Sequence, residues 1–284
     1  MIKRVLNSGA SSSRGLLRSW RVLIIMFVLY LAMIGATYEF FVTREATGGQ
    51  LLLSALLALA VPVLFLTIQT IAARYNQENQ QPASLLGRAL RDFWKLLVIS
   101  IPLILIAVLA SYLFSKFGSN APATAIREAA RSVPAASRAV VPKPQPVHWQ
   151  TVALTTLQYL IFFLILPLAA IHLWLVTARE GLDQAFKRSA RILIRGFAPQ
   201  PVITYAIGFI VFAVVPYFLV VTRTPAGTAW LDAGLLVVRL LLAVAFSLIG
   251  WVATVGALGE LSEASGAVNV APANEGPGHV PAEA

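Results

Sequence analysis

The dominant pattern in this chain is a series of six apolar runs, separated by segments that hold most of the polar residues. A helix needs about 20 predominantly apolar residues to cross a bilayer, and each run is long enough. Helices are expected because lipid offers no hydrogen-bond partner to unpaired backbone groups. The pattern predicts an all-α, polytopic membrane helical bundle, with spans at about 21–43, 50–73, 95–117, 151–177, 201–222 and 233–258.

Basic amphipathic segments precede the first, third and fifth spans, at 14–21, 85–95 and Gly181–Arg195. At 100° per residue, the apolar side chains of each segment fall on one face and the cations on the other. Such helices lie at a membrane surface, where their cations meet lipid phosphates. Alternatively, the segments only fix topology and anchor the spans. The predicted headgroup contacts are Arg14, Arg18, Arg21, Arg88, Arg91, Lys95, Lys187, Arg188, Arg191 and Arg195.

Matched positions in the second and fourth spans indicate an internal repeat. Pro62 and Pro167 lie 105 residues apart, as do Arg74 and Arg179. We predict three units, each with a basic interfacial helix, an outgoing span and a returning span. The third unit departs from this pattern because it ends in Gly259-Glu260 instead of an arginine. Alternatively, any six-span protein with basic loops on one side would show similar matches.

The loops predict the orientation of the bundle. Fourteen of the 22 Lys and Arg residues lie on the side that holds the N-terminus, and the more basic side is normally cytoplasmic. This predicts that both termini lie in the cytoplasm. The predicted parts are a basic N-terminal segment with an amphipathic helix (1–20), a six-span domain (21–258) with a Pro/Ala-rich outer loop (118–150), and a disordered acidic tail (259–284).

Composition supports the membrane assignment and narrows the choice of partners. The chain is 58% hydrophobic and 12% charged, against about 45–50% and about 25% in globular domains. In a soluble protein the net charge of +10 would suggest nucleic acid. Here the cations flank apolar spans, so anionic lipid headgroups of the cytoplasmic leaflet are the predicted partner, and nucleic acid is not. Binding to an unidentified protein partner or to a second copy of the chain is a further possibility.

Three ionisable residues lie within the predicted spans, where such groups are costly and therefore functional candidates. Glu39 and Arg239 have similar depths near the outer end and could pair, or each could extend alone to the interface. His172, in the fourth span, is expected to bond to a neighbouring helix more readily than to act in a relay. We predict close-packing positions in the sixth span at Ser247, Gly250, Gly256 and Gly259.

Motifs for catalysis or cofactor binding are not found. The chain has no cysteine, so disulfides and thiolate chemistry are excluded. The spans lack the carboxylates that a metal site would need, and no P-loop, GxGxxG, HExxH or GxSxG pattern occurs. We therefore expect a non-enzymatic accessory or scaffold protein without a cofactor. The alternative is a small-molecule or lipid transporter, since prolines such as Pro62 and Pro167 can mark broken helices.

Two segments, GLDQAFKRSARILIRGF after the fourth span and SLLGRALRDFWKLL after the second, carry a family resemblance. With the six-span arrangement over most of 20–258, they make the chain similar to the membrane domain of some bacterial glycerophosphodiester phosphodiesterases and to related stand-alone membrane proteins. Those enzymes owe their catalysis to a separate soluble barrel, which this chain lacks. The resemblance therefore implies an integral protein of the bacterial inner membrane and no catalytic residue.

Overall fold

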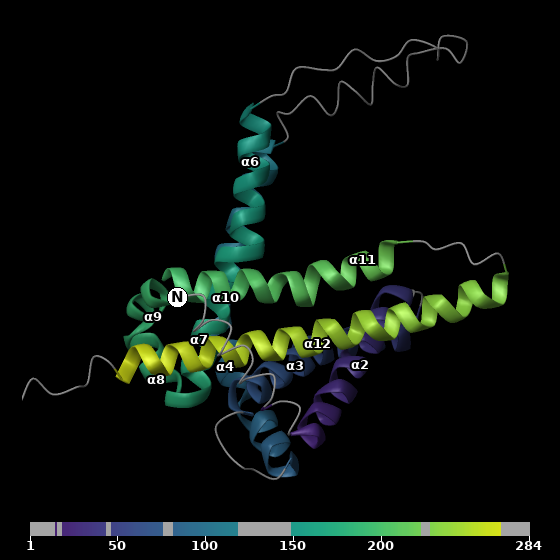
Figure 1. Cartoon of the computed structure of the whole chain (residues 1–284), viewed down its shortest axis with the longest axis horizontal. Helices are drawn as coiled ribbons and strands as arrows, with labels where there is room; N and C mark the ends of the chain where they lie inside the picture. Colours follow the sequence, from purple (N-terminus) through teal and green to yellow (C-terminus); the bar gives the residue numbers. More distant parts are fainter. Residues whose placement is uncertain are drawn as a thin grey trace, which may run out of the picture. The chain divides into compact units, whose positions relative to one another are not determined.

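The computed structural model describes residues 15, 19–43, 47–75, 82–118, 149–222 and 228–267, and in these ranges it is helical without strands (Figure 1). The π-helices η2 and η3 interrupt two of the spans. The helices are α2 (Trp20–Val42), α3 (Gly48–Arg74), α4 (Pro82–Gly118), α6 (Trp149–Leu160), η2 (Ile161–Ile165), α7 (Leu166–Glu180), α8 (Leu182–Lys187), α9 (Ser189–Gly196), α10 (Pro199–Phe209), η3 (Ile210–Val214), α11 (Val215–Val221) and α12 (Ala229–Ala267).

Six helical stretches in the described residues are long and apolar enough to cross a membrane. Large apolar side chains cover their outer faces: Leu105 is 63% exposed and Leu59 is 64% exposed. Contiguous apolar surface of this kind belongs against lipid and not against water. The chain is a multi-pass membrane protein, as predicted. The stretches are Trp20–Val42, Gly48–Arg74, Ser84–Lys116, Val152–Glu180, Pro199–Val221 and Trp230–Glu263.

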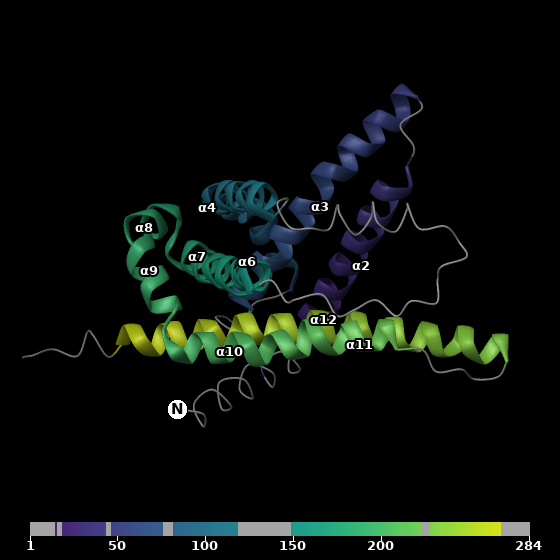
Figure 2. The same cartoon turned by 90° about the horizontal axis from the view of Figure 1, so that it is seen from above.

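The helices group into two compact units. The first contains the described residues up to Ile99 and from Ile171 onward, and the second is Ser100–Ala170. In the first unit, α2 and α3 form a hairpin, and α10, η3 and α11 run alongside α12 (Figures 1 and 2). In the second unit, the rings of Phe114 and Phe162 lie 6.5 Å apart and join α4 to η2.

Local sequence signals explain several helix ends. The Thr47 hydroxyl accepts a hydrogen bond from the Gln50 backbone N–H, and the Gln50 side chain accepts one from the Thr47 N–H, so α3 begins with a capping box. Gly181 separates α7 from α8 with φ 91°, a conformation that side-chain-bearing residues rarely adopt. Because Pro199 needs no backbone partner, it suits the first position of α10.

The three returning helices, α3, α7 and α12, contribute equivalent segments to the core of the first unit. Residues 66–73 of α3 are buried throughout, and residues 171–178 of α7 and 252–259 of α12 are buried or half-buried. These segments end immediately before Arg74, Arg179 and Glu260, which the predicted repeat makes equivalent. The segments that match in the predicted repeat are therefore the segments that the three helices bury.

Contacts between the returning helices also use equivalent positions. The rings of Phe65 and Trp174 lie 5.7 Å apart, and the Trp251 indole N–H donates to the Gln69 side-chain oxygen at 2.7 Å. In the register set by Arg74, Arg179 and Glu260, residues 65 and 251 match, as do 69 and 174. The same two positions thus join α3 to α7 and α3 to α12, which supports the three-unit repeat.

Two prolines explain where the spans change to π-helix. Pro167 and Pro216 each lie two residues after a π-helix, and neither can donate the backbone hydrogen bond that an α-helix requires. Just before them, Leu166 N–H donates to Ile161 O and Val215 N–H donates to Ile210 O, each five residues back. Pro62 lies inside the uninterrupted helix α3, so the matched prolines Pro62 and Pro167 have different structural effects.

Three details of the predicted segments are corrected by the structure. The segment 85–95 is no separate interfacial helix, because α4 runs through it without a break. The segment Gly181–Arg195 is divided into α8 and α9 at Arg188, whose φ of −108° and ψ of 7° depart from α-helical values. Helix α12 continues to Ala267, so residues 259–267 belong to it and not to a disordered tail. The loop 119–148 and the residues after 267 lie outside the described part of the chain.

Glycines allow α10 and α12 to approach closely. A Cβ at Gly208 would lie 2.9 Å from the Thr254 Cβ, and one at Gly250 would lie 3.1 Å from the Phe212 backbone nitrogen. The Ser247 hydroxyl donates to the Phe212 carbonyl at 3.1 Å, four residues before Pro216, where the proline leaves a carbonyl short of its α-helical donor. The predicted close-packing role of Gly250 is confirmed, and Ser247 contributes a hydrogen bond to the neighbouring backbone.

We expect Gly208→Ala to lower the free energy of unfolding by about 1–3 kcal/mol, because the added methyl group forces α10 away from Thr254. Gly35→Ala is the matched control, since a Cβ at Gly35 meets nothing within 4 Å. Alanine also favours helix over glycine, so the control should be neutral or stabilising. Thermal unfolding of the purified protein in detergent measures both effects, and equal stability of the two variants would contradict the close approach.

Candidate functional site

Arg74, the last residue of α3, links three elements at one end of the first unit. Its Nε and Nη2 donate to the Ala178 carbonyl at 3.0 and 2.8 Å, and its Nη1 lies 2.9 Å from Asp92 Oδ2. Ala178 lies in the last turn of α7, where carbonyls have no donor within the helix. The planar guanidinium thus satisfies the α7 terminus and a carboxylate of α4 simultaneously.

Arg179 makes the equivalent contact one repeat later. Its Nη1 donates to the Gly259 carbonyl at 3.2 Å and lies 2.7 Å from Glu263 Oε1, both on α12. Gly259 permits this because a Cβ there would collide with the guanidinium. Ala178 directly precedes Arg179, and Gly259 directly precedes Glu260. Arg179 and Glu260 are the residues that match Arg74 in the predicted repeat. We call the contacts of Arg74 with Ala178 and of Arg179 with Gly259 the arginine clasp.

The predicted headgroup contacts on α4 have different surroundings. Arg88 and Arg91 are exposed, whereas Lys95 Nζ lies 2.8 Å from Asp92 Oδ1. Asp92 is buried between Lys95 and Arg74, so its charge is compensated on both sides. Lys95 is therefore part of an internal ion cluster, and Arg88 and Arg91 remain the outward-facing cations of this segment.

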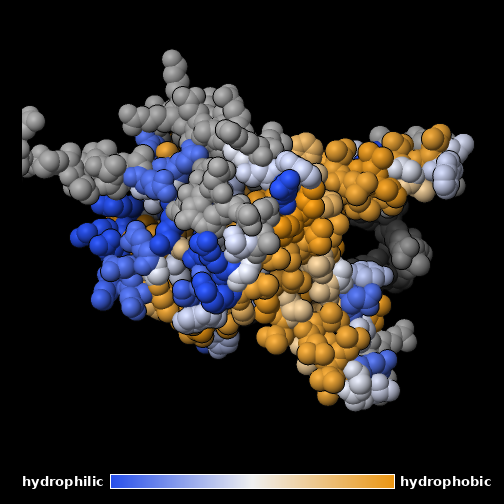
Figure 3. Space-filling model, turned by 90° about the horizontal axis from the view of Figure 1, so that it is seen from below, coloured by the Kyte–Doolittle hydropathy of each residue, from blue (hydrophilic) through white to orange (hydrophobic). Residues whose placement is uncertain are grey.

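Helices α8 and α9 carry cations and apolar side chains on their exposed surface. Lys187, Arg188, Arg191 and Arg195 are all exposed, and Arg188 contacts Glu180 at 3.3 Å. Figure 3 shows hydrophilic residues gathered on the left, where Figure 1 places α8 and α9, while hydrophobic residues cover most of the remaining drawn face. Apolar side chains that accompany the cations are Phe186 (45% exposed), Ile194 (76%) and Phe197 (39%).

The exposed α8–α9 surface has the composition of a membrane-interface helix, in which apolar side chains enter the acyl boundary and cations meet phosphates. We call Phe186, Lys187, Arg191, Ile194 and Arg195 the basic interfacial surface. Its three cations make no ion pair with another described residue. They are therefore available to an external anion.

The N-terminal cations are described only in part. Arg21 is exposed, and its guanidinium carbon lies 5.8 Å from the centroid of the Trp20 ring. This distance is within the range of a cation–π interaction, and an indole and a cation together suit the membrane interface. Arg14 and Arg18 lie outside the described residues.

The three intramembrane candidates do not form one site. Arg239 donates through Nη1 to the Thr222 carbonyl at the end of the fifth span, and Glu39 on α2 is exposed. No ion pair joins Glu39 to Arg239 in the described residues. His172 is buried, and its ring lies so close to Gly196 that a Cβ there would be 2.9 Å from the ring. Its position indicates packing between α7 and α9.

No group of three or more His, Cys, Asp or Glu side chains in the described ranges could hold a metal ion. Three of the described acidic residues form ion pairs with arginines: Asp92 with Arg74, Glu263 with Arg179 and Glu180 with Arg188.

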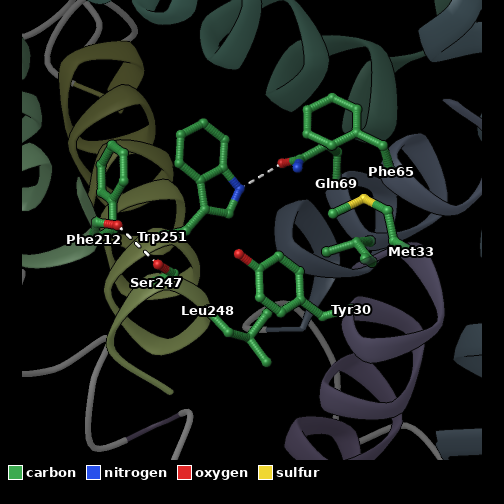
Figure 4. A pocket seen from close by; sticks show the side chains of 9 residues that line it. Tyr30, Met33, Phe65, Gln69, Phe212, Ser247, Leu248 and Trp251 are labelled. Atoms are coloured by element: carbon green, nitrogen blue, oxygen red, sulfur yellow. Dashed lines mark hydrogen bonds between the residues drawn. The ribbon is translucent and has the colours of Figure 1, made fainter. Parts of the chain in front are cut away.

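A partly open cavity of about 250 Å³ lies in the first unit, between α2, α3, η3 and α12. Most of its lining is apolar, including Phe65, Phe212 and Leu248. Figure 4 shows the hydrogen bond between Trp251 and Gln69 at its edge. Sequence reasoning missed this site. A glutamine inside an otherwise apolar span was a usable signal, because such side chains bond across helices.

Comparison with protein-family models, curated proteins and solved structures finds no match to this chain.

We expect Arg74→Lys to destabilise the protein by about 1–3 kcal/mol, because a lysine cannot reproduce the two hydrogen bonds to Ala178 together with the contact to Asp92. Arg91→Lys is the control, since Arg91 is exposed on α4 and the charge is unchanged. Thermal or denaturant unfolding in detergent compares the two. If both variants retain wild-type stability, the clasp contributes nothing to the fold.

Proposed function

We propose that this chain is a non-enzymatic accessory or scaffold protein of the membrane, which binds anionic lipid through its basic interfacial surface. The observation that carries the proposal is the exposure of Lys187, Arg191 and Arg195 beside Phe186 and Ile194. A phosphate-bearing headgroup would meet the cations while its acyl chains lie beside the apolar residues. Each cation near an anionic surface contributes on the order of 1 kcal/mol.

The proposed location is the bacterial inner membrane, with both termini in the cytoplasm and the basic interfacial surface at the cytoplasmic leaflet. The distribution of Lys and Arg over the loops supports this orientation. The similarity of GLDQAFKRSARILIRGF and SLLGRALRDFWKLL to the membrane domain of glycerophosphodiester phosphodiesterases is consistent with it.

A small-molecule or lipid transporter is the second candidate. Two observations favour it: the cavity between α2, α3, η3 and α12, and the π-helical interruptions at η2 and η3. Interruptions of this type often accompany functional sites. The prolines that follow the π-helices give them a purely structural explanation as well, so the accessory role is the better supported of the two.

The lipid proposal predicts that changing Lys187, Arg191 and Arg195 together to Gln weakens binding of phosphatidylglycerol. Three cations at about 1 kcal/mol each correspond to a loss of roughly a hundredfold at low ionic strength. Native mass spectrometry of the full chain in detergent, titrated with phosphatidylglycerol or phosphatidylcholine, measures the loss. The control exchanges the same cations between Lys and Arg and keeps the charge. Unchanged phosphatidylglycerol binding by the Gln variant would rule out this surface.

The orientation predicts which positions are accessible from outside the cell. The chain has no cysteine, so single cysteines can be placed near residues 80, 130 and 190 without removing native ones. In intact cells whose outer membrane is permeabilised, an impermeant thiol reagent should label the position near 130 and spare the other two. Labelling near 80 and 190 with protection near 130 would mean the opposite orientation.

A further inference from the structure

The cavity between α2, α3, η3 and α12 is apolar on most of its surface, yet polar groups meet at one edge. The Trp251 indole nitrogen donates to the Gln69 side-chain oxygen at 2.7 Å, and Gln69 is only 3% exposed. An indole N–H can only donate, so the Gln69 oxygen must face Trp251. The amide NH2 group of Gln69 is left as a donor that the Trp251 contact does not use.

Tyr30 contributes a second donor to the same cavity. Figure 4 shows the Tyr30 hydroxyl directed towards the space beside the Trp251–Gln69 pair. The hydroxyl forms no hydrogen bond with another described residue, and neither does the Gln69 amide nitrogen. The third polar group of the lining, Ser247, already donates to the Phe212 carbonyl. The cavity therefore offers donors to a ligand that accepts hydrogen bonds.

The lack of charge in the cavity lining and the depth of Gln69 narrow the choice of ligand further. None of the residues that line the cavity is charged, so an anion would lose its hydration without compensation there. Gln69 precedes Arg74 by five residues, which places it about 7–8 Å inward from the clasp along α3. Arg74 ends its span, at the level where cations meet lipid phosphates. In a glycerolipid, the uncharged ester carbonyls lie between the phosphate and the acyl chain, which is the depth of Gln69.

Size indicates that only part of a molecule enters. The volume of about 250 Å³ lies below the roughly 300–1,000 Å³ of sites that enclose a whole small ligand. The opening lets the remainder of a longer molecule stay in the bilayer. An acyl chain with its ester group meets these requirements, since it combines apolar length with a neutral hydrogen-bond acceptor.

We propose that this cavity binds one acyl ester of a glycerolipid, with the ester carbonyl accepting hydrogen bonds from Tyr30 and Gln69 and the chain packing against Phe65, Met33 and Leu248. The site is distinct from the basic interfacial surface and does not depend on it. It recognises the ester, whereas the basic interfacial surface recognises the headgroup charge.

The test compares a diacyl phosphatidylcholine with its dialkyl ether analogue of equal chain length, which lacks the carbonyls. Native mass spectrometry of the full chain in detergent should show the ester lipid binding roughly two- to tenfold more tightly, the effect of about one neutral hydrogen bond. Tyr30→Phe should reduce this preference. Tyr38→Phe is the control, because Tyr38 lies on the same helix, is 64% exposed and does not line the cavity.

Met33→Trp, which fills the cavity, should remove the ester preference altogether, with thermal unfolding used to confirm that the variant is folded. Equal affinity of the wild-type protein for the two lipids would overturn the proposal. A full ester preference in Tyr30→Phe or in folded Met33→Trp would also overturn it. Both probe lipids carry the same zwitterionic headgroup, so these results are independent of anionic lipid binding at Lys187, Arg191 and Arg195.

Discussion

The arginine clasp is the interaction on which the arrangement of the returning helices depends. Arg74 ties α3 to the last turn of α7, and Arg179 ties α7 to α12. Both guanidinium groups bond to backbone carbonyls, and the first satisfies a helix end that would otherwise lack donors. Since apolar side chains gain little from leaving lipid for one another, polar contacts of this kind are well suited to fixing helix partners inside a membrane.

Close backbone approach provides the second constraint. Gly208 and Gly250 bring α10, η3 and α12 together, and the Ser247 hydroxyl reaches the Phe212 carbonyl next to the proline-induced π-helix. The interruption in the fifth span is therefore compensated by a hydrogen bond from the sixth. This explains how a span with an irregular backbone is tolerated where lipid supplies no donor.

The two proposed lipid contacts use different chemistry on the same unit. The basic interfacial surface presents the charges of Lys187, Arg191 and Arg195, while the cavity presents the neutral donors of Tyr30 and Gln69. Together they match the two polar regions of a glycerolipid, its headgroup and its esters. Arg74 and Lys95 are also charged, but both form ion pairs with Asp92 within the fold.

The sequence alone determined the helical class, the number of spans and their approximate ends, because a bilayer demands long apolar runs whatever their neighbours are. It also identified the equivalence of Arg74 and Arg179. Only the tertiary structure decided the break at Arg188, the pairing of Trp251 with Gln69 and the hydrogen bond of Arg239 to the Thr222 carbonyl. These depend on which helices lie side by side, and periodicity within one helix carries no information about its partner.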